Sequence, residues 1–328
     1  MGNYKIALIQ RTNDDTVYYV FPGGGIEHEE APKSGAKRER GETMTNKIRS
    51  NLFYLKQFGF NDSLLQTIFQ LRLDPLESIF NNENEMIMEI ESKFTDKDRE
   101  LARNYQKYKN FKYELFNTEA FLKDGSSKIY FKYDQNELTA LIPEKNMPLF
   151  MYSKGDVSQL SLDRKRVAIV GTRKPSGKSI ELTKKITQEY VRNNYIIVSG
   201  LAEGIDTVSH ATTLDLGGKT IAVLPTNFNK IYPKENQVVA DLISEKGLLL
   251  TAIGPKENTY KSSFLDRNQY VANISDLIIV IETNLKSGTM NTIRNAYKAN
   301  KKILFVDQGD EAINNKIFEF GGEMLNDK

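Results

Sequence analysis

The sequence contains no cysteine and only two histidines among its 328 residues. Without cysteine there can be no disulfide bond and no thiolate metal site, and His28 and His210 are too few for an imidazole-rich metal centre. There is also no signal-peptide pattern and no run of about 18 apolar residues, which excludes a secretory signal and a membrane-spanning helix. We therefore expect a cytoplasmic protein with no metal, no cofactor and no membrane partner.

The two glycine-rich motifs of nucleotide enzymes are also missing. No segment matches the dinucleotide motif G-x-G-x-x-G, because Gly200 and Gly204 are spaced as G-x-x-x-G, and no Walker motif G-x-x-x-x-G-K-[ST] is present. Hydride transfer and nucleotide hydrolysis thereby lose their main sequence support. We predict no catalytic residue.

An excess of charge of one sign is lacking too. The formal net charge is +2, which does not by itself indicate a nucleic-acid partner. Basic residues are nevertheless concentrated between Ser161 and Gln188, where they outnumber Asp163 and Glu181. A solvated helix face explains such a run as well as a ligand surface does. The residues are Arg164, Lys165, Arg166, Arg173, Lys174, Lys178, Lys184 and Lys185.

The second half of the chain alternates short apolar runs with longer amphipathic segments. Runs rich in valine, isoleucine and leucine, with little polar alternation, are typical of strands buried on both faces of a parallel sheet. The pattern predicts an α/β fold with a doubly wound, mostly parallel, Rossmann-like sheet. The predicted strands are Val167 to Val170, Ile196 to Ser199, Ile221 to Leu224, Leu248 to Ala252, Leu277 to Ile281 and Ile303 to Val306.

The first half of the sequence predicts a small helical domain and a connecting segment. Residues 44–110 carry apolar residues at helical spacing, which indicates a small helical N-terminal domain. Gly59 and Asn61 should end its first helix, and Asp62 or Ser63 could cap the next. Residues 111–160 read as a connecting segment with short strands, including residues 128–132, and residues 161–328 as the Rossmann-like domain. At the start of the chain, residues 5–9 and 16–21 resemble two strands. The buried helical face is predicted to contain Leu52, Leu55, Phe58, Leu64, Leu65, Ile68, Phe69 and Leu71.

Ligands of open parallel sheets bind at the carboxyl ends of the strands, so the residues that follow each predicted strand are candidates for a site. The glycines, hydroxyls and arginines found there suit a phosphate group. A single loop of this composition could be an ordinary turn. Three such loops are predicted at the same end of the sheet, which favours a binding site. Arg267, which we place in a loop before the fifth strand, could join them. The three loops contain Gly171, Thr172 and Arg173, then Ser199 and Gly200 with Gly204 and Asp206 opening a helix, and then Lys286, Ser287, Gly288 and Thr289.

Several longer segments, in order, resemble the DprA/Smf family. They are VAIVGTRKP from Val167, SGLAEGID from Ser199, GGKTIAVLP with IYPKEN up to Asn236, GLLLTAI from Gly247, FLDRNQYVANISD from Phe264 and KSGTMNT from Lys286. The segment from Met44 is similar to the helical N-terminal domain of that family. The resemblance covers Met44 to the end and leaves no room for the C-terminal winged helix of many members.

The resemblance implies a non-enzymatic protein that binds and protects single-stranded DNA, helps to load RecA during transformation or recombination, and forms a homodimer. Phe264 and Tyr260 are the nearest aromatics that could stack on a base, although packing inside the protein is the alternative for Phe264. The DNA-contacting residues that it implies are Gly171, Thr172, Arg173, Lys174, Ser199, Gly200, Phe264, Arg267, Asn268, Lys286, Ser287, Gly288 and Thr289.

Residues 1–43 resemble something else, a truncated Nudix box in which the carboxylates would bind divalent metals. Thr43 replaces the last glutamate of the motif, so we do not expect hydrolysis from this leader. A second alternative is a nucleotide-binding sensor or a LOG-like nucleotide hydrolase of the same superfamily, which could act in phage defence. Thr292 stands where the LOG-type enzymes carry a catalytic glutamate, which argues against hydrolysis. The Nudix-like positions are Gly24, Glu30, Arg38, Glu39 and Glu42.

Overall fold

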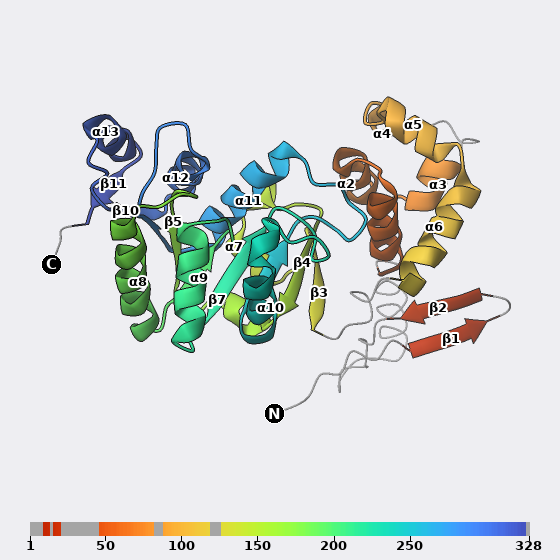
Figure 1. Cartoon of the computed structure of the whole chain (residues 1–328). Helices are drawn as coiled ribbons and strands as arrows, with labels where there is room; N and C mark the ends of the chain where they lie inside the picture. Colours follow the sequence, from red (N-terminus) through yellow and green to blue (C-terminus); the bar gives the residue numbers. More distant parts are fainter. Residues whose placement is uncertain (1–8, 14–15, 21–45, 82–87, 119–125, 326–328) are drawn as a thin grey trace, which may run out of the picture. The chain divides into compact units, whose positions relative to one another are not determined.

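The computed structural model (Figure 1) describes residues 9–13, 16–20, 46–81, 88–118 and 126–325. The chain divides into two compact units, residues 1–125 and residues 126–328. In the first unit, β1 (Ile9–Asn13) and β2 (Thr16–Val20) pair antiparallel, with Asn13 opposite Thr16. The second predicted strand is therefore in place. Of the first predicted strand, residues 5–8 lie outside the described residues, and Ile9 belongs to β1, which continues to Asn13.

The rest of the first unit is helical, as predicted. Gly59 has a φ of +118°, a left-handed conformation that favours glycine, and it follows the first helix directly. The next helix is capped by Asn61, whose side chain accepts the Leu64 N–H, so the prediction of Asp62 or Ser63 as the cap was wrong. The helices span residues 46–58, α2 (Asp62–Gln70), α3 (Pro75–Phe80), α4 (Met88–Glu91), α5 (Asp96–Ala102) and α6 (Tyr105–Thr118).

One buried carboxylate ties this unit together. Asp98 is 1% exposed and accepts hydrogen bonds from the backbone N–H groups of Asn61 and Thr95, from the Asn61 side-chain amide and from the Thr95 hydroxyl. It thereby links the N-terminus of α2 to the capping box of α5.

Asp98→Ala should destabilise the helical unit by about 2–3 kcal/mol, because four hydrogen-bond donors lose an acceptor that is buried. Urea denaturation followed by circular dichroism measures the change. Asp96→Ala is the matched control, since Asp96 is exposed in the first turn of the same helix and should cost about 0.3–1 kcal/mol. Equal losses for the two variants would contradict this account of Asp98.

The second unit is built on a nine-stranded sheet in the order β11-β10-β9-β5-β6-β7-β8-β4-β3. Strands β5 to β11 pair parallel with one another, and at one edge β4 pairs antiparallel with both β8 and β3. The strands are β3 (Ser127–Phe131), β4 (Phe150–Gly155), β5 (Arg166–Val170), β6 (Ile196–Ser199), β7 (Thr220–Leu224), β8 (Leu248–Thr251), β9 (Leu277–Val280), β10 (Lys302–Phe305) and β11 (Gly322–Met324).

All the strands predicted in the second half are present, and the doubly wound fold class is confirmed. Two strands escape the sequence pattern: β4 lies within the segment read as a connection, and β11 has only three residues. Residues 111–160 thus contain the end of α6 as well as β3 and β4.

Alternate residues of the central strands enter two separate cores, as expected for a parallel sheet with helices on both faces. Ala168 and Val170 face a core shared with α11 and α12, whereas Val167 and Ile169 face a core with α8 and α9. Figure 1 shows α8, α9 and α10 side by side on one face of the sheet. The helices are α7 (Glu137–Leu141), α8 (Gly177–Arg192), α9 (Ile205–Asp215), α10 (Gln237–Lys246), α11 (Lys261–Ile274), α12 (Gly288–Lys298) and α13 (Glu311–Glu319).

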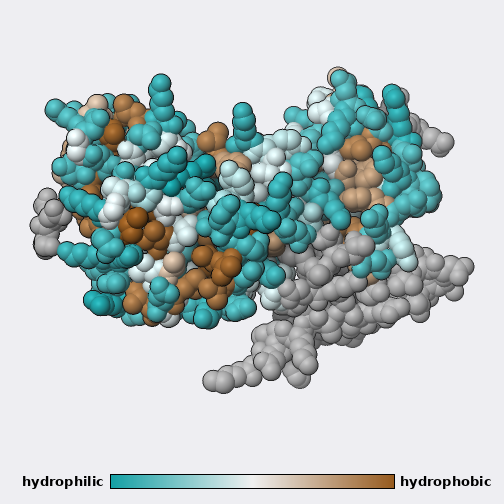
Figure 2. All heavy atoms as spheres, viewed as in Figure 1, coloured by the Kyte–Doolittle hydropathy of each residue, from teal (hydrophilic) through white to brown (hydrophobic). Residues whose placement is uncertain are grey.

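The visible surface of the second unit is mainly hydrophilic, with separate hydrophobic patches (Figure 2). Scattered exposed apolar side chains such as Val238 and Leu242 are ordinary for a folded domain. Among the described residues, no helix is long and apolar enough to cross a membrane.

The basic stretch between Ser161 and Gln188 does not form one surface. Arg166 is only 2% exposed, and its guanidinium donates to the carbonyl oxygens of Ile274 and Ser161. Burial lowers its pKa. Lys184 pairs with Glu181 on the outside of α8, so this part of the run is a solvated helix face. Arg173 and Lys174, in the loop after β5, are the members that reach a pocket.

Candidate functional site

The order of the central strands creates a crevice at their carboxyl ends. After β5 the chain continues to β6 on one side, and it returns as β9 on the other side of β5. The loops after β5 and β9 therefore diverge, and ligands of open α/β sheets bind at such a switch point. A pocket of about 540 Å³ lies there, lined by the loops after β5, β6 and β9 and by α11 and α12.

Most of the predicted site residues lie around this pocket. Ser199 and Lys286 do not line it. Ser199 is buried and donates its hydroxyl hydrogen to the Ile169 carbonyl, and Lys286 is exposed on the loop after β9. The residues that do line it are Gly171, Thr172, Arg173, Lys174, Gly200, Phe264, Arg267, Asn268, Ser287, Gly288 and Thr289. Their contact with a ligand remains a prediction.

Arg267 has an unusual environment. It lies in α11, so its placement in a loop was wrong, and it is only 6% exposed. Its Nη1 is 3.7 Å from Oδ2 of Asp206, and its Nε and Nη1 have no hydrogen-bond partner in the structure. Burial lowers the pKa of Arg267, and the nearby Arg173 acts in the same direction while Asp206 opposes it. A buried guanidinium with unused donors suits an anion that enters the pocket.

Asp206 and Gly200 hold this guanidinium in place. Asp206 accepts the backbone N–H groups of Gly200 and Ala202, at 3.1 and 3.3 Å, so it fixes the loop after β6. Burial raises its pKa, and Arg267 is the largest opposing influence. Gly200 leaves the space that Arg267 fills, since a Cβ there would lie 1.2 Å from Nη1.

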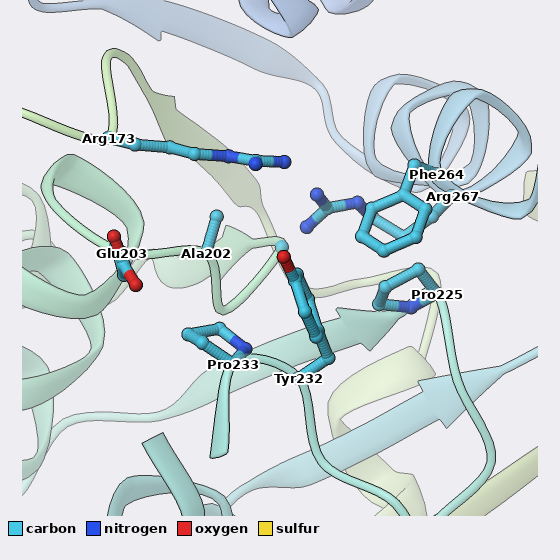
Figure 3. Close-up of a pocket in the computed structure, with 9 residues that line it drawn as sticks. Arg173, Ala202, Glu203, Pro225, Tyr232, Pro233, Phe264 and Arg267 are labelled. Atoms are coloured by element: carbon cyan, nitrogen blue, oxygen red, sulfur yellow. The ribbon is translucent and has the colours of Figure 1, made fainter. Parts of the chain in front are cut away.

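Arg173 faces Arg267 across a smaller cavity of about 80 Å³. Figure 3 shows both guanidinium groups and the Tyr232 hydroxyl directed toward the same space, with Phe264 and Pro225 at its side. Arg173 itself is exposed. Two cations directed toward one cavity suit a phosphate or a carboxylate as a ligand.

The aromatic part of the site differs from the prediction. Phe264 lies at the pocket, and its ring packs edge-on against Tyr232, with centroids 5.3 Å apart. Tyr260 is 61% exposed and lines neither pocket. Tyr232 was missed because it comes from the irregular segment after β7, where only the tertiary structure brings it to Phe264.

Several predicted phosphate donors are already used inside the protein. The Thr172 N–H donates to the Glu282 carbonyl at 2.7 Å, and the Thr289 hydroxyl donates to the Gly171 carbonyl at 3.0 Å. Ser287 caps α12 by accepting the Met290 N–H. These groups shape the loops through their hydrogen bonds within the protein, and their contact with a ligand stays a prediction. Arg173, Lys174 and Arg267 are the cationic side chains that line the pocket.

His210 lies one turn after Asp206 on α9 and is fully buried. The Thr220 hydroxyl donates to the Ile197 carbonyl, so it can only accept from Nδ1 of His210, and the imidazole is neutral with its proton on Nδ1. Burial, with Arg267 as a second cause, lowers its pKa to about 3. Nε2 has no hydrogen-bond partner in the part of the chain that the structure describes.

A neutral buried histidine makes stability depend on pH. Because the folded-state pKa lies below the ordinary value of about 6.5, the unfolded chain binds the proton first, and stability falls as the pH drops from about 6.5 toward about 3. The contribution of His210 is about 1.4 kcal/mol per pH unit in this window. Urea denaturation at pH 7 and pH 5 should show a smaller loss for His210→Gln than for the parent. An identical loss would contradict the assignment.

The residues that the alternative functions would use lie in two parts of the chain. Thr292 lines the pocket at the position where a LOG-type enzyme would need a carboxylate. Within the described part of the chain, no group of three or more histidine, aspartate or glutamate side chains is arranged to hold a metal. The Nudix-like carboxylates lie in residues 21–45, outside the described residues.

Comparison with curated proteins gives several relatives. The chain is 36% identical over 159 residues to the DNA processing protein DprA of Bacillus subtilis, which covers 48% of this chain and 53% of the relative. It is 31% identical over 217 residues to the DprA of Streptococcus pneumoniae, covering 66% of this chain and 69% of that one. The matched part thus spans about half the length of the first relative.

Two solved structures share the fold. The DprA structure from S. pneumoniae superposes with a TM-score of 0.61 at 23% identity and covers 84% of this chain and 94% of its own. DNA processing protein A from Helicobacter pylori, described for its single-stranded DNA binding mode, superposes with a TM-score of 0.54 at 29% identity. That match covers 61% of this chain and 91% of the H. pylori chain.

The family model for DNA recombination-mediator protein A matches residues 130–322. This range begins in β3 and includes the switch-point crevice, both arginines and Gly200. The resemblance seen in the sequence motifs is confirmed, and the chain belongs to the DNA recombination-mediator protein A family.

Proposed function

We propose that the chain binds single-stranded DNA in the pocket at the carboxyl ends of β5, β6 and β9. The observation that carries this proposal is the buried guanidinium of Arg267, which faces Arg173 across the cavity and whose Nε and Nη1 have no hydrogen-bond partner among the described residues. A phosphate of the DNA backbone supplies the anion between them. The H. pylori relative with a described single-stranded DNA binding mode supports the same choice of ligand.

The pocket favours a single strand over a duplex. Phe264 and Tyr232 lie beside the arginines, and an unpaired base can stack on an aromatic ring while its phosphate meets a cation. Such contacts tolerate any base, so we infer binding without strong sequence preference. The protein would act without catalysis: it would protect the strand and help to load RecA, as a homodimer, in recombination or transformation.

The salt-dependent affinity for a labelled single-stranded oligonucleotide, compared with a duplex of equal length, tests the proposal. Arg173→Ala should weaken binding by about 1.5–3 kcal/mol, roughly 10- to 150-fold, and should lower the slope of log K against log salt by about 0.7. Lys185→Ala is the control, because Lys185 is an exposed cation on α8 outside the pocket. Equal binding by the parent and Arg173→Ala would refute the assignment of the site.

A nucleotide sensor is the second candidate. The pocket volume of about 540 Å³ lies within the range of small-ligand sites. Calorimetric titration with nucleoside mono- and diphosphates distinguishes the two functions. Tight nucleotide binding that depends on Arg173, without oligonucleotide binding, would favour the sensor.

A further inference from the structure

The loop between β5 and α8 carries Arg173 and Lys174. It begins at Gly171, directly after β5, and ends at Ser176, the N-cap of α8. Arg173 is exposed, and its guanidinium reaches into the cavity from this loop (Figure 3). An exposed arginine loses side-chain entropy when a ligand fixes it, so its contribution to binding depends on how firmly its backbone is held.

One residue, Glu282, fastens this loop on both sides of Arg173. Glu282 lies two residues after β9, the strand that pairs with β5. Its backbone carbonyl accepts the Thr172 N–H at 2.7 Å. Its carboxylate Oε2 accepts the Ser176 N–H at 3.0 Å and the Ser176 hydroxyl at 3.1 Å. The segment that carries Arg173 is thereby tied to the loop after β9.

The Glu282 carboxylate is held in its ionised form. It lies at the N-terminus of α8, where the N–H groups and the helix dipole favour a negative charge. Burial raises the pKa of Glu282, but hydrogen bonds from the Ser176 N–H and from the hydroxyls of Ser179 and Ser176 outweigh this effect, and the pKa lies below its ordinary value. Hydrogen bonds to an ionised acceptor are roughly twice as strong as bonds between neutral groups.

Glu282 is itself fixed from the loop after β10. Oε1 of Gln308 accepts the Thr283 N–H at 2.7 Å, and Nε2 of Gln308 donates to the Ile281 carbonyl at 3.2 Å. These bonds bracket Glu282 along the chain. Glu282 is not among the residues that line the pocket of about 540 Å³, so its link to that pocket runs through the loop that it holds.

We propose that Glu282 is a positioning residue for DNA binding, which sets the place of Arg173 opposite Arg267 by holding the loop between β5 and α8. The inference rests on the proposed function of this pocket. If only charge mattered, a carboxylate beside a phosphate site would weaken binding, because like charges repel. Positioning and repulsion therefore predict opposite effects when Glu282 is lost.

Two variants of Glu282 separate these effects, with the affinity for a labelled single-stranded oligonucleotide as the measurement. Glu282→Ala leaves the Ser176 donors without their acceptor and should weaken binding roughly five- to tenfold. Glu282→Gln keeps an oxygen acceptor for Ser176 and should bind like the parent or more tightly. Glu181→Ala, which removes an exposed acid from the outside of α8, is the matched control and should change the affinity by less than about twofold. Parent-like or tighter binding by Glu282→Ala would overturn the proposal.

A double-mutant cycle shows whether Glu282 acts through Arg173. In the Arg173→Ala background, Glu282→Ala should cause almost no further loss, because the side chain that Glu282 positions is gone. Equal losses in both backgrounds would overturn the proposal, since Glu282 would then support the folded domain in general. If Arg173→Ala itself binds like the parent, the proposed DNA site is refuted and the positioning role with it. A large loss in Arg173→Ala beside an unchanged Glu282→Ala refutes the positioning role alone.

Discussion

Arg267→Met should abolish most of the affinity for single-stranded DNA. The variant keeps a long side chain but removes the buried guanidinium, whose Nε and Nη1 are the unused donors of the cavity. Loss of charge-assisted hydrogen bonds costs about 1.5–3 kcal/mol, roughly 10- to 150-fold in affinity. Fluorescence anisotropy with a labelled oligonucleotide measures this loss.

The same variant should also lose stability, since it leaves the Asp206 carboxylate buried without its cation. Breaking a buried pair by removing one partner costs about 3–5 kcal/mol. A second change, Asp206→Asn, removes the unpaired carboxylate charge. The double variant should therefore regain much of the lost stability without regaining DNA binding. Recovery of DNA binding in the double variant would show that the guanidinium is structural and not a ligand contact.

Gly200→Ala is expected to have an effect of similar size through a single methyl group. A Cβ at this position would lie 1.2 Å from Nη1 and 2.2 Å from Cζ of Arg267, so the guanidinium must leave its place. The displaced side chain no longer faces Arg173, and the affinity for single-stranded DNA should fall by roughly tenfold or more. The oligonucleotide anisotropy assay reports the loss.

Gly177→Ala provides the control for this substitution. Gly177 is the first residue of α8, and a Cβ there meets nothing within 4 Å. The change should leave binding unaltered and raise stability slightly, because alanine is favoured over glycine in a helix. Parent-like DNA binding by Gly200→Ala would mean that Arg267 does not need its present position to hold the ligand.

The strands were predictable because burial on both faces leaves continuous apolar runs in the sequence. Val167 to Val170 and Ile196 to Ser199 could be read directly, and their loops with them. The strand β4 was hidden, since FMYSKG mixes polar and apolar residues and its pairing with β8 is set by the tertiary fold. Pattern alone identifies strands that are buried on both faces better than those near an edge.

Helix α11 shows why Arg267 was misplaced. The buried positions of this helix include polar as well as apolar residues, so the sequence has no continuous apolar stripe from which the helix could be predicted. They include Ser263, Arg267, Asn273, Tyr270 and Val271. A helix that turns polar side chains inward conflicts with the usual amphipathic pattern. Such conflicts are expected where a protein builds a site. The identity of Arg267 as a candidate came from the motif, and its burial and its pairing with Asp206 came only from the structure.

The cavity between Arg173 and Arg267 also has a practical consequence for handling the protein. Two cations that face each other across an open space repel, and any small anion that enters relieves this repulsion. Because a ligand that binds only the folded state raises its stability, sulfate or phosphate in a buffer would stabilise the protein and compete with DNA. We therefore expect thermal melts and DNA affinities obtained in phosphate to differ from those obtained in a chloride buffer.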